Sequence, residues 1–87
     1  MTEEEEISKK LTPLDATILS ILNKRRLTVE EVREEVNSVR MSLRYPPIND
    51  KNVLEVLKKL HSLGLVRALE IRDKTYWELT EKGTKLA

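Results

Sequence analysis

The sequence predicts an α+β fold with three core helices, a C-terminal β-hairpin and a short final helix. Three observations support this. Two segments begin with a threonine cap, at Thr12 and Thr28, and continue with apolar residues at helical spacing. A third amphipathic segment, residues 49–63, ends at Gly64 and is followed by two strand-like runs.

Composition limits the chain to one small domain. Its 87 residues include no cysteine, so neither disulfides nor thiolate metal sites are expected. Charged residues make up 36% of the sequence and glutamine is absent, a bias that resembles thermophile proteins. No apolar run reaches membrane-spanning length, and the acidic start is unlike a signal peptide, so we expect a cytoplasmic protein without membrane partners.

Residues 1–10 contain four consecutive glutamates and little apolar material. We expect them to form a disordered acidic tail, which either solubilises the chain or competes with nucleic acid for a basic surface. The net charge of the whole chain is +1. From residue 11 onward the chain has 14 Lys and Arg against 11 Asp and Glu, a net charge of +3, which is only mildly basic.

The first two core helices have clear starts. Thr12, followed by Pro13 and Asp15, predicts a helix that runs to about residue 23. Thr28 with Glu31 three residues later predicts a second capping box. We expect the buried stripe of this second helix to consist of Val29, Val32, Val36 and Val39. Its opposite face is acidic, and the loop at 40–48 is basic and aromatic.

The third helix is expected to begin at a cap on Asn49 and to bury Val53, Leu57 and Leu60. Two strands, residues 65–72 and 75–79, then pair as a hairpin whose turn type stays open. Alternation places Trp77 and Leu79 toward the core. A short strand near residues 26–27 would complete a small sheet, and Thr80 caps a last turn that ends near residue 86.

This C-terminal half resembles the recognition helix and wing of winged helix-turn-helix regulators of the MarR-like and PadR-like kind. The resemblance is carried by the spacing of Val53, Leu57 and Leu60 and by two junctions, Leu63-Gly64-Leu65-Val66-Arg67 and Leu79-Thr80-Glu81-Lys82-Gly83. It covers residues 11–87, which would form the winged-helix domain. It implies a small transcriptional regulator that binds double-stranded DNA, with the third helix in the major groove and the hairpin as a wing on the backbone.

The resemblance also implies which residues would contact DNA. Asn52 and Glu55 would reach base edges, since Asn suits adenine and Glu accepts from cytosine. The remaining candidates are basic residues that would contact the groove or the phosphate backbone: Lys51, Lys58, Lys59, Arg40, Arg44, Arg72 and Lys74.

Catalysis and cofactor binding are not expected. His61 is the single histidine, the glycines are Gly64 and Gly83, and the sequence contains neither a phosphate-binding loop nor a set of metal ligands. A second function stays open, because winged helices also dock onto proteins. The acidic second helix would suit a subunit of a replication (DNA polymerase) or transcription complex. The oligomeric state is open between a monomer and a weak homodimer.

Overall fold

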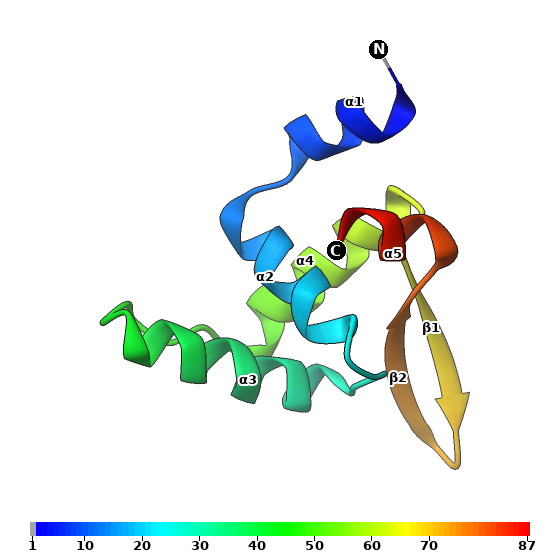
Figure 1. Ribbon diagram of the computed structural model, residues 1–87. Coiled ribbons are helices and arrows are strands. Elements are labelled where there is room, and N and C mark those ends of the chain that lie inside the picture. The colour runs from blue at the N-terminus through cyan, green and yellow to red at the C-terminus, as the bar shows by residue number, and fades with distance from the viewer. Residues whose placement is uncertain (1) are drawn as a thin grey trace.

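The computed structural model describes residues 2–87, and from residue 13 onward its elements follow the predicted order (Figure 1). Two strands form an antiparallel hairpin, which lies beside a group of helices and is followed by a short C-terminal helix. In chain order the elements are α1 (Glu3–Lys10), α2 (Pro13–Leu22), α3 (Val29–Ser42), α4 (Asp50–Ser62), β1 (Val66–Ile71), β2 (Lys74–Leu79) and α5 (Glu81–Leu86).

Helices α2 and α3 both begin with the predicted capping box. The Thr12 hydroxyl accepts the Asp15 backbone N–H at 3.1 Å, and the Asp15 carboxylate accepts the Thr12 N–H at 2.9 Å. Thr28 and Glu31 repeat this exchange at 3.2 and 3.0 Å. Each box satisfies two backbone groups that a helix start would otherwise leave unpaired, which is why these boundaries are readable from the sequence.

Residues Glu3–Lys10 form helix α1, where we expected a disordered tail. Thr2 caps this helix, its first turn is acidic and its last turn is basic, an order that favours the helix dipole. Ile7 is buried in the common core, and Glu3 forms an ion pair with Lys82 of α5. The apolar contact of Ile7 and this long-range pair are not visible in the local composition. Met1 lies outside the described residues.

The hairpin has a tight turn of a defined kind. Strands β1 and β2 pair antiparallel from Val66↔Leu79 to Ile71↔Lys74, which leaves two residues in the loop. Arg72 and Asp73 both have positive φ, 51° and 67°. Positive φ at both central positions is the mark of a type I′ turn, whose twist matches that of the strands.

A third chain segment joins the sheet through Leu27. The Trp77 N–H donates to the Leu27 carbonyl at 2.7 Å, and the Leu27 N–H donates back at 3.0 Å. This single bridge is the short strand predicted near residues 26–27. It ties the α2–α3 connection to the middle of β2, and the predicted inward register of Trp77 is confirmed because its side chain is buried.

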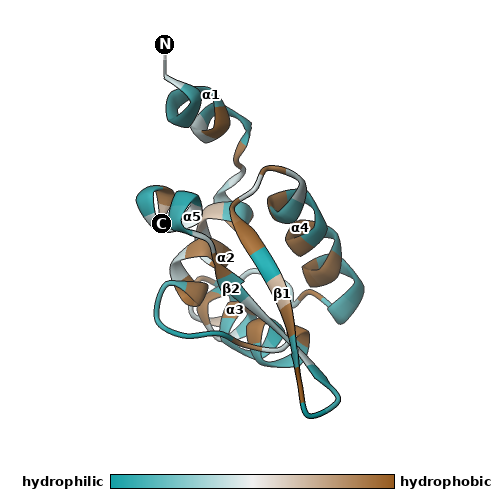
Figure 2. Cartoon of the chain, turned by 90° about the vertical axis from the view of Figure 1, so that its right-hand side faces the viewer, coloured by the Kyte–Doolittle hydropathy of each residue, from teal (hydrophilic) through white to brown (hydrophobic). Residues whose placement is uncertain are grey.

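The core is aliphatic and lies between α2, α3, α4 and the hairpin (Figures 1 and 2). Helix α4 buries the three residues predicted for it, because Val53, Leu57 and Leu60 are fully enclosed. The stripe predicted for α3 is wrong at its end: Val32 and Val36 are buried, whereas Val39 is exposed. Helix α3 has 14 residues against 10 in α2, and its C-terminal end projects from the helical group (Figure 1), so its last turns lack a covering neighbour.

Gly83 allows α5 to approach the start of the hairpin. A Cβ at this position would lie 2.0 Å from the Leu65 carbonyl oxygen. The same oxygen accepts the Thr80 N–H at 3.0 Å, and the Thr80 hydroxyl accepts the Gly83 N–H at 3.1 Å. The backbone of α5 is therefore held directly against residue 65, which places the base of the wing.

Candidate nucleic-acid interface

Helix α4 presents a polar stripe on the side opposite its buried face. Lys51, Asn52, Glu55 and Lys58 are exposed, and the spacing of Lys51, Glu55 and Lys58 places those three on one side of the helix. Figure 2 shows α4 beside the hairpin, with apolar residues on one side of the helix and polar residues on the other. The stripe is the part of α4 that a groove of DNA could reach.

Asn52, a candidate for base contact, also takes part in the cap at the start of α4. Its backbone N–H donates to the Asn49 side-chain oxygen at 2.9 Å, and its own Oδ1 accepts the Asn49 N–H at 3.2 Å. A bidentate contact with adenine uses both the oxygen and the amide nitrogen of asparagine. Asn52 can offer its amide N–H groups freely, whereas its oxygen would have to be shared with the cap.

Lys59 points away from the exposed stripe. Its Nζ lies 2.5 Å from Asp15 Oδ2 and donates to the Lys10 carbonyl at 3.0 Å. Asp15 is buried, so its charge needs this partner. Although the sequence suggested a phosphate contact, this geometry favours a role for Lys59 in joining α4 to the α1–α2 junction.

The wing carries its cations at the turn. Arg72 occupies the first turn position and Lys74 begins β2, and both side chains are exposed. The neighbouring pair of Arg67 and Glu78, which face each other across the strands, is joined by an ion pair, Arg67 Nε to Glu78 Oε2 at 2.5 Å. Two exposed cations, Arg72 and Lys74, therefore flank Asp73 at the tip.

Arg40 and Arg44 lie at the other end of α3, far from the wing (Figure 1). The Arg40 guanidinium stacks 5.6 Å from the centre of the Tyr45 ring, and its Nε donates to the Pro46 carbonyl at 2.7 Å. Arg40 thus fixes the loop that leads into α4. Arg44 is exposed, with a φ of 62° that turns the chain out of the helix.

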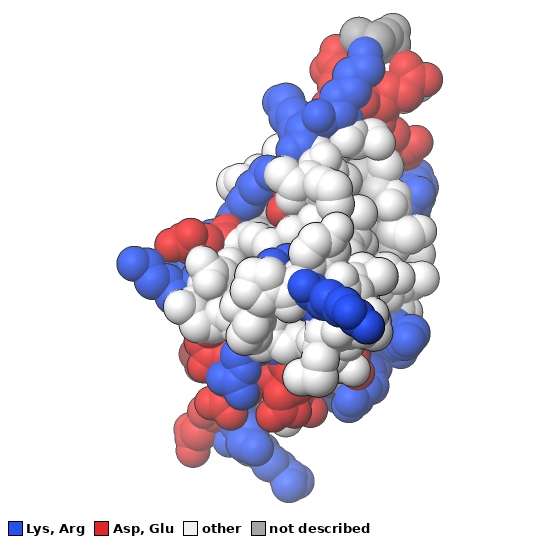
Figure 3. Space-filling model, turned by 90° about the vertical axis from the view of Figure 1, so that its left-hand side faces the viewer, with Lys and Arg blue, Asp and Glu red and all other residues white. Residues whose placement is uncertain are grey.

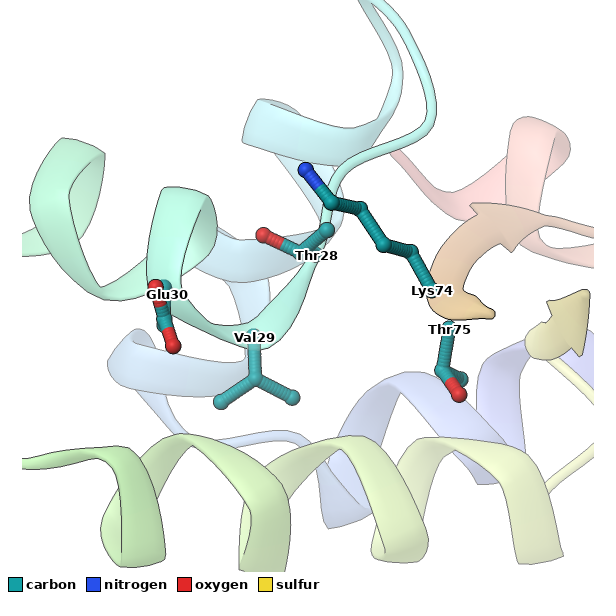
Figure 4. Close-up of a pocket in the computed structure, with 5 residues that line it drawn as sticks. All are labelled: Thr28, Val29, Glu30, Lys74 and Thr75. Carbon is teal, nitrogen blue, oxygen red and sulfur yellow. The ribbon is translucent and has the colours of Figure 1, made fainter. Parts of the chain in front are cut away.

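A shallow hollow separates the start of α3 from the wing (Figure 4). It has a volume of about 310 Å³ and is lined by Thr28, Val29, Glu30, Lys74 and Thr75. Lys74 lies on the wing side and Glu30 on the helix side, and the Lys74 side chain extends toward the α3 side in the view. Thr28 and Thr75 were not singled out as contact residues from the sequence, because only the folded wing brings Thr75 opposite the cap of α3.

The acidic face of α3 is partly neutralised by arginines. Arg25 lies 3.9 Å from Glu31 and 3.8 Å from Glu35, while Arg33 pairs with Asp50 at 2.8 Å. The Thr28 backbone N–H, with smaller contributions from Arg25 and Lys74, holds the pKa of Glu31 below its ordinary value. The acidic character of this face is therefore partly offset by neighbouring arginines.

Other chemistry is sparse in the described part of the chain. Among residues 2–87, no group of three or more His, Asp and Glu side chains could hold a metal ion. His61 packs edge-on against Trp77, with ring centres 6.4 Å apart. None of the helices in this range combines the length and the hydropathy needed to cross a membrane.

The arrangement of three helices, a bridging segment and a hairpin also occurs in solved regulators. The adhesin competence repressor AdcR of Streptococcus pyogenes superposes with a TM-score of 0.74 at 25% identity, over 90% of this chain and 53% of that one. ZitR of Lactococcus lactis, a zinc-responsive MarR family member, superposes with a TM-score of 0.70 at 25% identity. This match covers 87% of this chain and 48% of the ZitR chain. The fold is a winged helix-turn-helix of the MarR kind.

A third winged helix, hsRosR, was solved in a complex and gives a TM-score of 0.75 at 20% identity, over 91% of this chain and 68% of that one. ZitR has also been solved bound to DNA, at 24% identity and a TM-score of 0.71. This winged helix spans about half the length of the AdcR and ZitR chains. No protein-family profile and no curated protein matches its sequence.

Proposed function

We propose that this winged helix binds double-stranded DNA as a small, non-enzymatic transcriptional regulator in the cytoplasm, as a monomer or weak homodimer. The observation that carries the proposal is the exposed stripe of α4 beside the cationic tip of the wing. A helix and a hairpin arranged in this way can contact a major groove and the adjacent backbone together. The DNA complex of ZitR, which has the same fold, supports this use of the surface.

The side chains divide by chemistry. Lys51, Lys58, Arg72 and Lys74 are exposed cations that suit phosphate oxygens. Glu55 lies at the middle of the stripe and suits the amino group of cytosine. Asn52 would read a base chiefly through its amide N–H groups, because its oxygen accepts the capping bond.

The hollow between α3 and the wing would lie over the backbone between these two contacts. The Lys74 ammonium and the hydroxyls of Thr28 and Thr75 can donate to a phosphate there. The Glu30 carboxylate on its far side opposes a phosphate. We therefore expect modest affinity at physiological salt, in keeping with the small positive charge of the domain.

The test is a salt titration of DNA binding, measured by fluorescence anisotropy with a pool of random-sequence duplexes. Affinity should fall steeply with salt, and the combined replacement Lys58→Ala and Lys74→Ala should lower the slope by about 0.9 for each phosphate that the variant no longer neutralises. Lys85→Ala on α5 is the matched control, since it removes an exposed lysine of another element. Binding that is absent at low salt, or equal in the double variant and the control, would rule out the proposal.

A further inference from the structure

The large hydrophobic side chains that are exposed within residues 2–87 all fall in one short stretch. They are Val39, Met41, Leu43 and Tyr45, with Met41 76% and Leu43 61% exposed. Single exposed apolar side chains are ordinary in soluble proteins, whereas a contiguous group marks a binding surface. This group occupies the projecting end of α3 and the loop after it.

Three members of this group border a groove between α2 and α3, whereas Met41 lines neither of its recesses. Val39, Leu43 and Tyr45 line a recess of about 130 Å³ together with Pro13, Leu14 and Thr17 of α2. A wider recess of about 410 Å³ continues from Val39 along Ala16, Ser20, Ile21 and Lys24. The α2–α3 groove, as we call these two recesses, is thus apolar along its floor and open along its length.

The charges around the α2–α3 groove are mainly positive, and Glu35 beside Lys24 is the acidic exception. Lys24 lies at one end and Arg40 at the other, Arg44 follows in the loop after α3, and residues 38–47 contain no Asp or Glu. Figure 3 views the projecting end of α3, where uncharged atoms form the middle of the face, a basic side chain stands out from it, and both Lys or Arg and Asp or Glu side chains lie at its border. Of the nearby carboxylates, Asp15 is buried against Lys59, and Glu35 lies 3.8 Å from Arg25.

This charge pattern disfavours a second copy of the chain as the occupant. A two-fold dimer buries the same patch on both subunits, so the cations of one groove would face those of the other. Helix α1 of another copy is acidic, but its buried apolar residue, Ile7, is already used in its own core. The groove instead fits a partner that supplies negative charge and several apolar anchors.

We propose that the α2–α3 groove is a docking site for an acidic amphipathic helix of another protein. Apolar residues at positions i, i+3 or i+4, and i+7 would enter the recesses beside Val39 and Leu43. Acidic residues on the flanks would face Lys24, Arg40 and Arg44. The stacking of Arg40 on Tyr45 and its bond to Pro46 hold the rim in place before the partner arrives.

The proposed site goes beyond DNA binding and does not depend on it. The groove lies over α2 and the C-terminal end of α3, whereas the wing lies beyond the N-terminal end of α3 (Figure 1). A partner could therefore bind while α4 and the wing stay accessible. Such an arrangement would connect a DNA-bound domain to an acidic protein segment.

The experiment uses the full chain and a fluorescein-labelled synthetic peptide with leucines at helical spacing and glutamates elsewhere. A scrambled peptide of the same composition and a peptide with lysine in place of glutamate serve as controls. We expect saturable anisotropy with the acidic helix, and binding at least about tenfold weaker for both control peptides. Amide shifts of the isotope-labelled protein should change along α2 and the end of α3.

The protein variants test the same surface. Leu43→Ser removes an apolar anchor and Lys24→Glu removes a flanking cation. Each replacement should weaken binding of the acidic peptide by about tenfold. Met41→Ser and Lys85→Glu are matched controls outside the two recesses, and they should leave binding of the acidic peptide unchanged. Urea unfolding of each variant establishes that these exposed replacements leave the fold intact.

Three results would overturn the proposal. One is equal binding of the acidic and the lysine peptides. Another is peptide binding that Leu43→Ser leaves unchanged or that shifts only α4 and the wing. The third is a dimer in sedimentation equilibrium that Leu43→Ser dissociates, which would assign the groove to a second copy of the chain.

Discussion

Lys59 of α4 forms an ion pair with Asp15 of α2, and the same ammonium donates to the carbonyl of Lys10. One side chain thereby joins α4 to the end of α1 and the start of α2. Asp15 also accepts the Thr12 N–H, so its carboxylate caps α2 and anchors α4 together. The neighbouring residue, Lys58, is free on the surface stripe, which gives two adjacent lysines separate roles.

The first prediction distinguishes these two lysines. Lys59→Met should lower the free energy of unfolding by about 2–3 kcal/mol, below the loss for a fully enclosed pair because Lys59 is half-exposed. Lys58→Ala should change stability little and weaken DNA binding. Urea unfolding and the salt titration measure the two effects, and equal loss of stability in both variants would contradict the assignment.

The second prediction concerns the type I′ turn. Asp73→Gly should stabilise the protein by about 0.5–1 kcal/mol, because glycine adopts positive φ without strain. Arg72→Asn should likewise relieve the turn, yet it should weaken DNA binding because it removes a cation from the tip. Thermal unfolding and anisotropy of the two variants separate the backbone effect from the charge effect. A destabilised Asp73→Gly protein would show that the turn geometry is different.

The third prediction concerns Trp77, whose ring is buried and whose Nε1 has no hydrogen-bond partner among residues 2–87. Trp77→Ala should cost about 3–5 kcal/mol, because it leaves a large cavity beside β2. Trp77→Phe should cost clearly less, since phenylalanine fills most of the space and buries no donor. The native protein should emit at blue-shifted wavelengths that redden on unfolding; fully exposed emission in the folded state would refute the burial.

The fourth prediction concerns pH and Glu31. Its pKa is lower in the folded protein than the ordinary value of 4.5, so folding favours the charged carboxylate. The charged carboxylate contributes its full stabilisation at a pH above 4.5. This stabilisation is lost as the pH falls below 4.5 and through the lower pKa of the folded protein. The Glu31→Gln variant should therefore lose less free energy of unfolding than the parent protein when the pH is lowered from about 6 to about 3. Urea unfolding at each pH measures this difference. If the free energies of unfolding of the variant and the parent fell in parallel with pH, Glu31 would make no such contribution.

The sequence was sufficient for the elements whose signals are local. Thr12, Thr28, Asn49 and Thr80 each cap the helix predicted to follow them, because a capping side chain bonds to a backbone group only three residues away. The inward register of Trp77 followed from strand alternation in the same way. The interface residues were chosen by resemblance and exposure, and their contacts with DNA stay predictions.

Contacts between distant residues could not be predicted in this way. Glu3 to Glu6 suggested disorder from composition, yet Ile7 reaches the core and Glu3 meets Lys82 at the other end of the chain. Lys59 looked like any surface lysine until α2 brought Asp15 against it. Val39 continued an apolar stripe, but its burial depended on whether another helix extended far enough to cover it.

The sequence by itself therefore determined the order and the starts of the elements from residue 12 onward, because caps and apolar periodicity act within a few residues. The winged-helix class followed from the resemblance of the C-terminal half. Tertiary structure alone decided which charged side chains stay available for a partner. That choice depends on packing between segments far apart in the chain: it commits Lys59 to Asp15 and leaves Lys58 exposed beside the wing. The same packing leaves the end of α3 uncovered and so creates the apolar groove.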